Sequence, residues 1–238
     1  MSSRPYDARF LSSLLKFFLI QKRYTITVFK KSTMNTLNLC RPGHGASCAL
    51  CCGSHNYNAP FEEIHALFKR RREIFKLYSS EYIAKCIRAS RSSLTGSYYP
   101  FRNIDENIII TLPKLYQDGI QCPFVILLDD GTIGCALYPE SSHHDMRFDC
   151  FNNYTCKYFS CHSKEILTTA EIEYAARLFK DWYYYTLFIH SINILRQFKE
   201  RYPHLENVSF EDINKLKQTL GNQLFTDTNL HTIHSYFS

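Results

Sequence analysis

The sequence predicts an α+β fold that is mostly α-helical, with helices packed around a small β-hairpin and a multi-cysteine metal site. Apolar residues recur at helical spacing after Pro60 and after Thr168, which indicates two helical regions. Residues 121–137 between them have the pattern of two short strands around a glycine-containing turn. Ten cysteines among 238 residues exceed ordinary usage but fall below the density of a small disulfide scaffold. A hydrophobic content of 45% supports a packed core.

The first helix is expected to begin at Pro60 and to run to about Arg88. Proline suits the first helical position, and Glu62 and Glu63 place negative charge in the first turn, where the helix dipole favours it. The apolar side chains at helical spacing are Ile64, Leu67, Phe68, Ile74, Phe75, Tyr78 and Tyr82. Cys86 continues this stripe, so we interpret it as a small buried hydrophobe outside the metal site.

The segment from Gln121 to Leu137 predicts a β-hairpin. Its turn is expected at Asp129-Asp130-Gly131, because Asp-Gly is frequent in tight turns between strands. Two cysteines, Cys122 and Cys135, fall within this segment. The hairpin thus carries part of the cysteine pattern described below.

The remaining chain is expected to be helical. Thr168-Thr169-Ala170-Glu171 is a capping-box pattern, which predicts a helix from Thr169 to about Arg201 that Tyr202-Pro203 ends. Its middle, residues 183–189, is apolar on all sides and is expected to pack against the helix that begins at Pro60. A last helix is expected from Phe210 to about Leu220, with Gly221 as its C-terminal cap.

The positive charge of the chain lies at its N-terminus. Residues 1–33 hold seven of the 28 Lys and Arg residues but one of the 22 Asp and Glu residues, so the remainder is neutral. Two explanations stay open: translation starts at Met34, or residues 1–33 are a basic extension. Residues 34–238 are expected to form a single cysteine-cluster metal-binding domain with C-terminal helices. Its neutral charge argues against a nucleic-acid partner.

The sequence predicts a cytoplasmic protein without a membrane partner. The apolar stretch at residues 11–20 is split by Lys16 and lacks a small-residue cleavage site, so it does not resemble a signal peptide. The longest uncharged helical stretch, Trp182 to Leu195, is shorter than the roughly 20 residues that a bilayer requires. In a reducing compartment, clustered cysteines indicate metal ligands or catalysts.

Three cysteines in the run Ser47-Cys48-Ala49-Leu50-Cys51-Cys52-Gly53 carry the strongest functional signal. Thiols at this spacing share one face of a helical turn, and adjacent cysteines do not normally form an unstrained disulfide. Three thiols leave a tetrahedral zinc or an iron–sulfur cluster short of ligands, so later cysteines must return to the same place. The predicted ligands are Cys48, Cys51, Cys52, Cys122, Cys135, Cys150, Cys156 and Cys161. Five histidines flank the thiols as further candidates: His44, His55, His143, His144 and His162.

The order of these cysteines resembles the bacterial CxxCxxCC family of cysteine-cluster domains, for which zinc or iron is the expected metal. The resemblance covers roughly residues 40 to 162 and rests on Cys48, Cys51, Cys52 and Gly53, then Cys122, then Cys135 and Tyr138, and finally Cys156, Phe159 and Cys161. Two features depart from the family pattern. Gly45 stands where its first cysteine is expected, which leaves Cys40 as a replacement, and residues 146–150 lack the expected proline.

The predicted function is metal binding, by zinc or an iron–sulfur cluster, with the metal organising the fold and the biochemical role open. The alternative is a metal- or cluster-dependent enzyme, such as a methyltransferase related to flagellin lysine methylases, which resemble this chain in their cysteine cluster. The sequence has no G-x-G-x-x-G loop, so a nucleotide pocket built on one is not expected. The metal ion is the predicted partner, and a protein partner is unknown.

Overall fold

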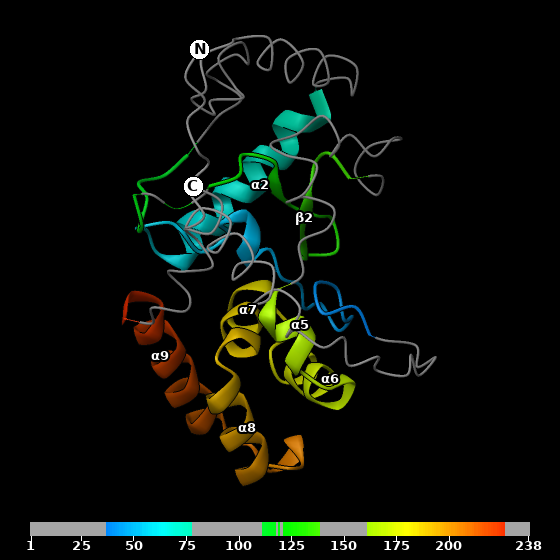
Figure 1. The fold of residues 1–238 in the computed structure, drawn as a ribbon. Coiled ribbons are helices and arrows are strands. Elements are labelled where there is room, and N and C mark those ends of the chain that lie inside the picture. Colours follow the sequence, from blue (N-terminus) through cyan, green and yellow to red (C-terminus); the bar gives the residue numbers. More distant parts are fainter. Residues whose placement is uncertain (1–36, 78–110, 118, 120, 139–160, 227–238) are drawn as a thin grey trace, which may run out of the picture. The chain divides into compact units, whose positions relative to one another are not determined.

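A computed structural model describes residues 37–77, 111–117, 119, 121–138 and 161–226 (Figure 1). These residues are mostly helical and include one two-stranded antiparallel sheet, which confirms the predicted fold class. The elements are a 3-10 helix (Leu50–Cys52), α2 (Phe61–Leu77), β1 (Val125–Leu127), β2 (Ile133–Cys135), α5 (His162–Ile166), α6 (Thr169–Leu178), α7 (Trp182–His190), α8 (Ile192–Arg201), a second 3-10 helix (Leu205–Asn207) and α9 (Phe210–Thr226). The predictions for residues 1–33, the helix end near Arg88, Cys86, Cys150 and Cys156 lie outside the described residues.

Helix α2 begins at Phe61, one residue after the predicted start at Pro60, and packs on β1. Its buried side chains, Ile64, Leu67, Phe68, Arg71 and Phe75, follow the helical repeat. The rings of Phe75 and Phe124 lie 5.5 Å apart and join the helix to the start of the hairpin. This apolar face positions the hairpin, and with it two of the cysteines, against α2.

The predicted hairpin is present, with Val125 paired to Cys135 and Leu127 to Ile133. Gly131 has a φ of 79° in its turn, a conformation that glycine adopts without strain. The backbone amide of Leu128 donates to the carbonyl of Thr132 at 2.7 Å and closes the turn. The register therefore places Cys135 at the far end of the sheet from the turn.

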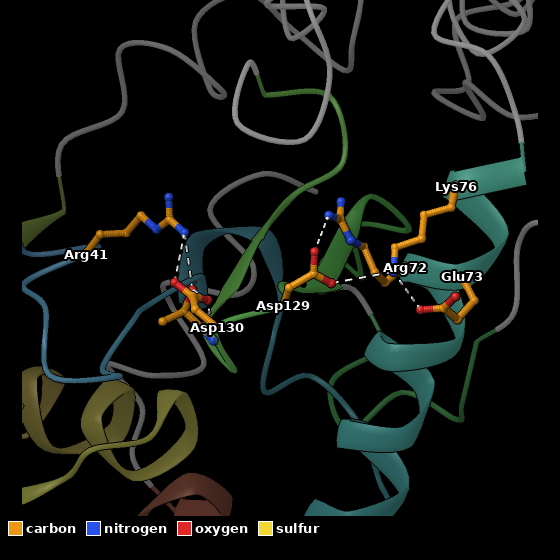
Figure 2. Close-up of polar contacts among 7 residues, drawn as sticks. Arg41, Arg72, Glu73, Lys76, Asp129 and Asp130 are labelled. Atoms are coloured by element: carbon orange, nitrogen blue, oxygen red, sulfur yellow. Dashed lines mark hydrogen bonds and ion pairs between the residues drawn. The ribbon is translucent and has the colours of Figure 1, made fainter.

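Ion pairs hold the hairpin turn from two sides (Figure 2). Asp129 accepts from Arg72 at 3.2 Å and from Lys76 at 3.5 Å, both from α2. Asp130 lies 3.9 Å from Arg41, which is next to Cys40 in the sequence. Exposed pairs of this kind contribute little stability individually, but here they link the hairpin to two other segments.

The single helix expected from Thr169 to about Arg201 is wrong, because the chain breaks it twice to give α6, α7 and α8. At the first break Phe179 is buried, and Asp181 caps the next helix by accepting from the Tyr184 amide at 2.7 Å. At the second break Ser191 leaves helical geometry, with φ −97° and ψ 62°. Burial of apolar side chains on both sides of these breaks, among them Phe179, Trp182, Phe188 and Leu195, overrides the continuous helical periodicity.

The expected helix end at Gly221 is also wrong, since α9 continues to Thr226. Leu216, Leu220 and Leu224 are all buried, and α9 packs on α7. Glycine inside a helix costs about 1 kcal/mol relative to alanine, and burial of one leucine side chain beyond it stabilises the helix by about 1.5–3 kcal/mol. Burial of the leucines therefore outweighs the cost of Gly221, and the helix continues past it.

The start of the apolar stretch, at Trp182 and Tyr183, packs against α2, whereas the sequence predicts such packing for the whole of residues 183–189. The rings of Trp182 and Phe68 lie 5.3 Å apart, and those of Tyr183 and Phe61 lie 5.2 Å apart. On the following turns Leu187, Phe188 and Ile189 are fully buried. Helix α7 also contacts α6, α8 and α9. Within the described ranges, none of the helices is long and apolar enough to cross a membrane.

The predicted capping box at the start of α6 is confirmed and extends into an ion pair. The Thr168 amide donates to Glu171 at 2.8 Å, the Glu171 amide donates to the Thr168 hydroxyl at 3.2 Å, and Arg196 of α8 donates to Glu171 at 2.7 Å. Burial by itself would raise the pKa of Glu171, but the hydrogen bonds from Arg196 and Thr168 outweigh it and hold the pKa at about 2.

We expect Glu171→Gln to lower the free energy of unfolding by roughly 1 to 3 kcal/mol, because it weakens the cap and the charged hydrogen bond. In the wild type, the Glu171 carboxylate stabilises the fold fully at pH values above 4.5, the ordinary pKa of the group. This stabilisation is lost as the pH falls toward the folded-state pKa of about 2. Urea unfolding at pH 7 and at low pH would measure it, with Glu200→Gln, at an exposed glutamate of α8, as control. An equal difference between wild type and Glu171→Gln at both pH values would contradict the assignment.

Candidate metal centre

The loop before α2 brings Cys40 beside Cys48. The Cys48 amide donates to the Cys40 carbonyl at 3.0 Å. Between them the chain reverses through Gly43, His44 and Gly45, which all have positive φ. This reversal brings Cys40 next to Cys48, which is required if Cys40 replaces the missing first cysteine.

Gly45 itself stands where the resembled family has a cysteine. Its φ is 80°, and a Cβ atom at this position would lie 3.1 Å from the carbonyl oxygen of Lys180. A cysteine here would be strained by its backbone conformation and would press on the chain between α6 and α7. The local fold therefore explains why this position is glycine.

We expect Gly45→Cys to lower the free energy of unfolding by about 1–3 kcal/mol without increasing the metal content. Gly43→Cys is the matched control, since Gly43 has a φ of 95° but a Cβ atom there would meet nothing within 4 Å. Gly43→Cys should lower the free energy of unfolding by less than Gly45→Cys, because it introduces backbone strain but no close contact. Denaturant unfolding and metal analysis would test both variants. Tighter metal binding by Gly45→Cys would contradict this account.

Cys51 and Cys52 lie in the one-turn 3-10 helix that ends at Gly53. Gly53 has a φ of 75°, and its amide donates to the Leu50 carbonyl at 2.8 Å. Leu50 is buried and anchors the turn in the core. The two neighbouring thiols are thus carried by a tight turn with a fixed backbone.

The hairpin brings Cys122 and Cys135 to this turn. The Cys122 amide donates to the Cys52 carbonyl at 3.0 Å. On its other side the Cys122 carbonyl accepts from the fully buried Arg71 of α2 at 3.2 Å. The Arg71 guanidinium also donates to the phenol oxygen of Tyr57 at 3.1 Å. Arg71 therefore fixes the backbone on which Cys122 sits.

Burial and neighbouring thiols raise the pKa values of the cysteines. Cys40 is exposed as a residue, but partial desolvation of its thiol, followed by the neighbouring thiols of Cys51 and Cys161, raises its pKa from 9.0 to about 12. Burial also raises the pKa of Cys48 well above its ordinary value, with further contributions from Cys40, Cys51 and Cys161. These thiols are therefore protonated at neutral pH when no cation is bound, and a metal ion has to displace their protons.

The thiols that raise one another's pKa values fall into two groups, and Cys51 belongs to both. The first group is Cys40, Cys48, Cys51 and Cys161. In the second group the pKa of Cys52 is raised first by its hydrogen bond with Cys51, then by burial and by the thiols of Cys51, Cys122 and Cys135. Six of the eight predicted ligands, together with Cys40, thus belong to one connected set.

The donor chemistry of this set fits zinc or an iron–sulfur cluster, since both favour thiolate ligands. All seven described cysteines are thiols rather than disulfides. Within the part of the chain that the structure describes, no three His, Cys, Asp or Glu side chains form a group arranged to hold a metal ion. Ligation by this set would therefore require the thiols to draw closer together.

The two histidines nearest the cysteine motif make contacts that stabilise the fold. His55 is fully buried, and its ring nitrogens lie 2.9 Å from the Ser54 hydroxyl and 3.1 Å from the Tyr183 carbonyl. His44 points to Glu173 of α6, with 3.0 Å between Nε2 and the carboxylate. His162 is exposed at the start of α5. His143 and His144 lie outside the described residues.

Sequence reasoning missed a different histidine. His190, the last residue of α7, has its Nε2 atom 3.6 Å from the Sγ atom of Cys48 and its Nδ1 atom 2.9 Å from the Ser163 hydroxyl. The residues in contact are 142 positions apart in the chain, and no local motif marks the pairing. The one sequence feature that could have drawn attention to His190 is that it is a titratable residue at the end of an otherwise apolar stretch.

Comparison with known proteins finds no match to a family model, a curated protein or a solved structure. The resemblance to the CxxCxxCC family therefore stays a prediction based on the cysteine motifs themselves.

Proposed function

We propose that this protein is a cytoplasmic metal-binding protein of the CxxCxxCC type, in which zinc or an iron–sulfur cluster is held by the cysteine set and organises the fold. One observation carries the proposal. The Cys122 amide donates to the Cys52 carbonyl at 3.0 Å, and the Thr186 hydroxyl of α7 donates to the Ser47 carbonyl beside Cys48 at 3.2 Å, so that both segments pack against the turn of Cys51 and Cys52. Segments more than one hundred residues apart thus converge on a single turn.

A metal at this position would stabilise the fold by cross-linking those segments. The first group joins the loop before α2 to the start of α5, and the second joins the same loop to the hairpin. Because the ligands are not gathered in the unfolded chain, the free energy of metal binding becomes free energy of folding. A reducing compartment keeps the thiols available for this role.

Metal analysis of the anaerobically purified full chain tests the proposal. We expect zinc or iron at on the order of one to four equivalents per chain, as the number of thiols permits. A brown protein with acid-labile sulfide would identify a cluster, and a colourless protein with zinc would identify a zinc site. A folded, metal-free protein whose thiols all react readily with a thiol reagent would refute the proposal.

The same sample distinguishes metal as a structural element from metal as a catalyst. A site filled entirely by protein ligands should show no spectral response to added cyanide or S-adenosylmethionine, because catalytic metal sites are the ones that retain an exchangeable position. We expect no response from the cobalt-substituted or cluster-loaded protein. A shift at stoichiometric ligand would favour the enzyme hypothesis.

A further inference from the structure

Helix α7 presents His190 to Cys48 in a well-defined position. Thr186, one turn earlier on the same helix face, lies 3.2 Å from the Ser47 carbonyl, to which its hydroxyl donates. The phenol of Tyr185 donates to the Leu39 carbonyl at 2.7 Å. Both contacts are buried. They fix α7 against the residues that flank Cys40 and Cys48, and so they set the distance between His190 and the thiol.

The hydrogen bond to Ser163 fits one tautomer of His190 that suits ligation. When Nδ1 carries the proton and donates to the Ser163 hydroxyl at 2.9 Å, the lone pair of Nε2 faces the Cys48 thiol. Metal-binding histidines are usually oriented in this way, by a hydrogen bond from the ring nitrogen that does not bind the metal. Ser163 is two residues after Cys161, so a single short segment supplies both a thiol and the group that orients the imidazole.

The separation of the two atoms also fits a shared metal. In a tetrahedral zinc site with Zn–S near 2.3 Å and Zn–N near 2.05 Å, the sulfur and nitrogen atoms lie about 3.6 Å apart. The observed separation between Cys48 Sγ and His190 Nε2 is 3.6 Å. A thiol-to-imidazole hydrogen bond spans the same distance, so a measurement has to separate the two cases.

We infer that His190 is a metal ligand through Nε2, next to Cys48, in a centre that Cys40 and Cys161 complete. This inference rests on the proposed metal-binding function and adds a nitrogen donor to a set otherwise made of thiols. A metal ion here would take the place of the proton between Sγ and Nε2, while Cys40 and Cys161 move toward it. Cys51 would then remain with Cys52, Cys122 and Cys135 in the second group.

X-ray absorption of the purified full chain, at the edge of whichever metal it holds, tests this directly. We expect imidazole nitrogen scattering beside sulfur in the wild type. His190→Cys should keep the metal and give an all-sulfur spectrum. Ser163→Ala should weaken metal affinity by about 10- to 100-fold, the usual effect of removing a hydrogen bond that orients a ligand, and His190→Ala should weaken it further. His44→Ala is the control and should leave the spectrum unchanged.

The outcomes separate the two proposals. Metal bound by sulfur alone in the wild type would overturn the role of His190 and leave the proposed function standing, with the histidine as a hydrogen-bond partner of Cys48. Nitrogen scattering that persists unchanged in His190→Cys would also overturn it. A wild-type protein without metal would overturn both. The wild-type spectrum decides the question even where a variant fails to fold.

Discussion

Cys51→Ser is expected to remove all bound metal and to leave the protein unfolded or insoluble. Cys51 is a predicted ligand of the second group and influences the thiols of the first. Its loss should remove the metal of one group and, because metal binding is coupled to folding, destabilise the other. Cys135→Ser and Cys161→Ser each lie in one group and should remove part of the metal. Structural zinc contributes about 10–16 kcal/mol of apparent binding free energy in small domains, which exceeds the stability of many proteins. Metal content per chain and circular dichroism would measure the two effects.

Cys86→Ser serves as the control for these variants. The sequence places Cys86 on the apolar stripe of the helix that begins at Pro60, and we predict that it retains all metal at a modest packing cost. Equal metal content in the Cys51, Cys135 and Cys86 variants would refute the assignment of ligands. A larger metal loss in Cys161→Ser than in Cys51→Ser would contradict the central position given to Cys51.

Trp182→Ala is expected to lower the free energy of unfolding by about 3–5 kcal/mol, the usual effect of removing a large aromatic side chain from a core. Trp182 is 1% exposed. Its ring contacts Phe68 and Phe61 of α2 as well as His55 of the cysteine-bearing loop. The substitution would therefore open a cavity at the junction of three segments. Chemical denaturation followed by far-ultraviolet circular dichroism is the appropriate measurement.

Phe210→Ala is the matched control for Trp182→Ala. Phe210 is an aromatic residue at the start of α9 that is 79% exposed, and truncation of exposed side chains usually changes stability by less than about 0.5 kcal/mol. Trp182→Phe should retain most of the stability, because it keeps a ring in the same space. A similar loss in Trp182→Ala and Phe210→Ala would contradict the packing of α7 on α2.

Local signals predicted the parts of the fold that local interactions determine. Pro60 marks the start of α2, Gly131 lies in the hairpin turn, and the Thr168 capping box opens α6. The errors arose where packing decides instead. The breaks near Asp181 and Ser191 follow from which apolar side chains enter the core, and periodicity alone cannot show this.

The candidate site was predictable to a similar degree. The thiol-rich motif at Cys48 and the later cysteines are visible in the sequence, but among the described residues no three candidate ligands form a group arranged to hold a metal ion. The place of Cys40 depends on a chain reversal through residues with positive φ, which a cysteine count does not reveal. The contact between His190 and Cys48 depends on how α7 docks, and tertiary packing alone determines it.

The two thiol groups would be completed at different times during synthesis of the protein. Ribosomes add about 5–20 residues per second, so His190 follows Cys48 by roughly 7 to 28 s, given their separation of 142 residues. The hairpin that carries Cys122 and Cys135 emerges before α5 and α7. The nascent chain thus presents the second group complete while the first still lacks Cys161 and His190. Metal delivered during translation would meet a site around Cys51 and Cys52 first.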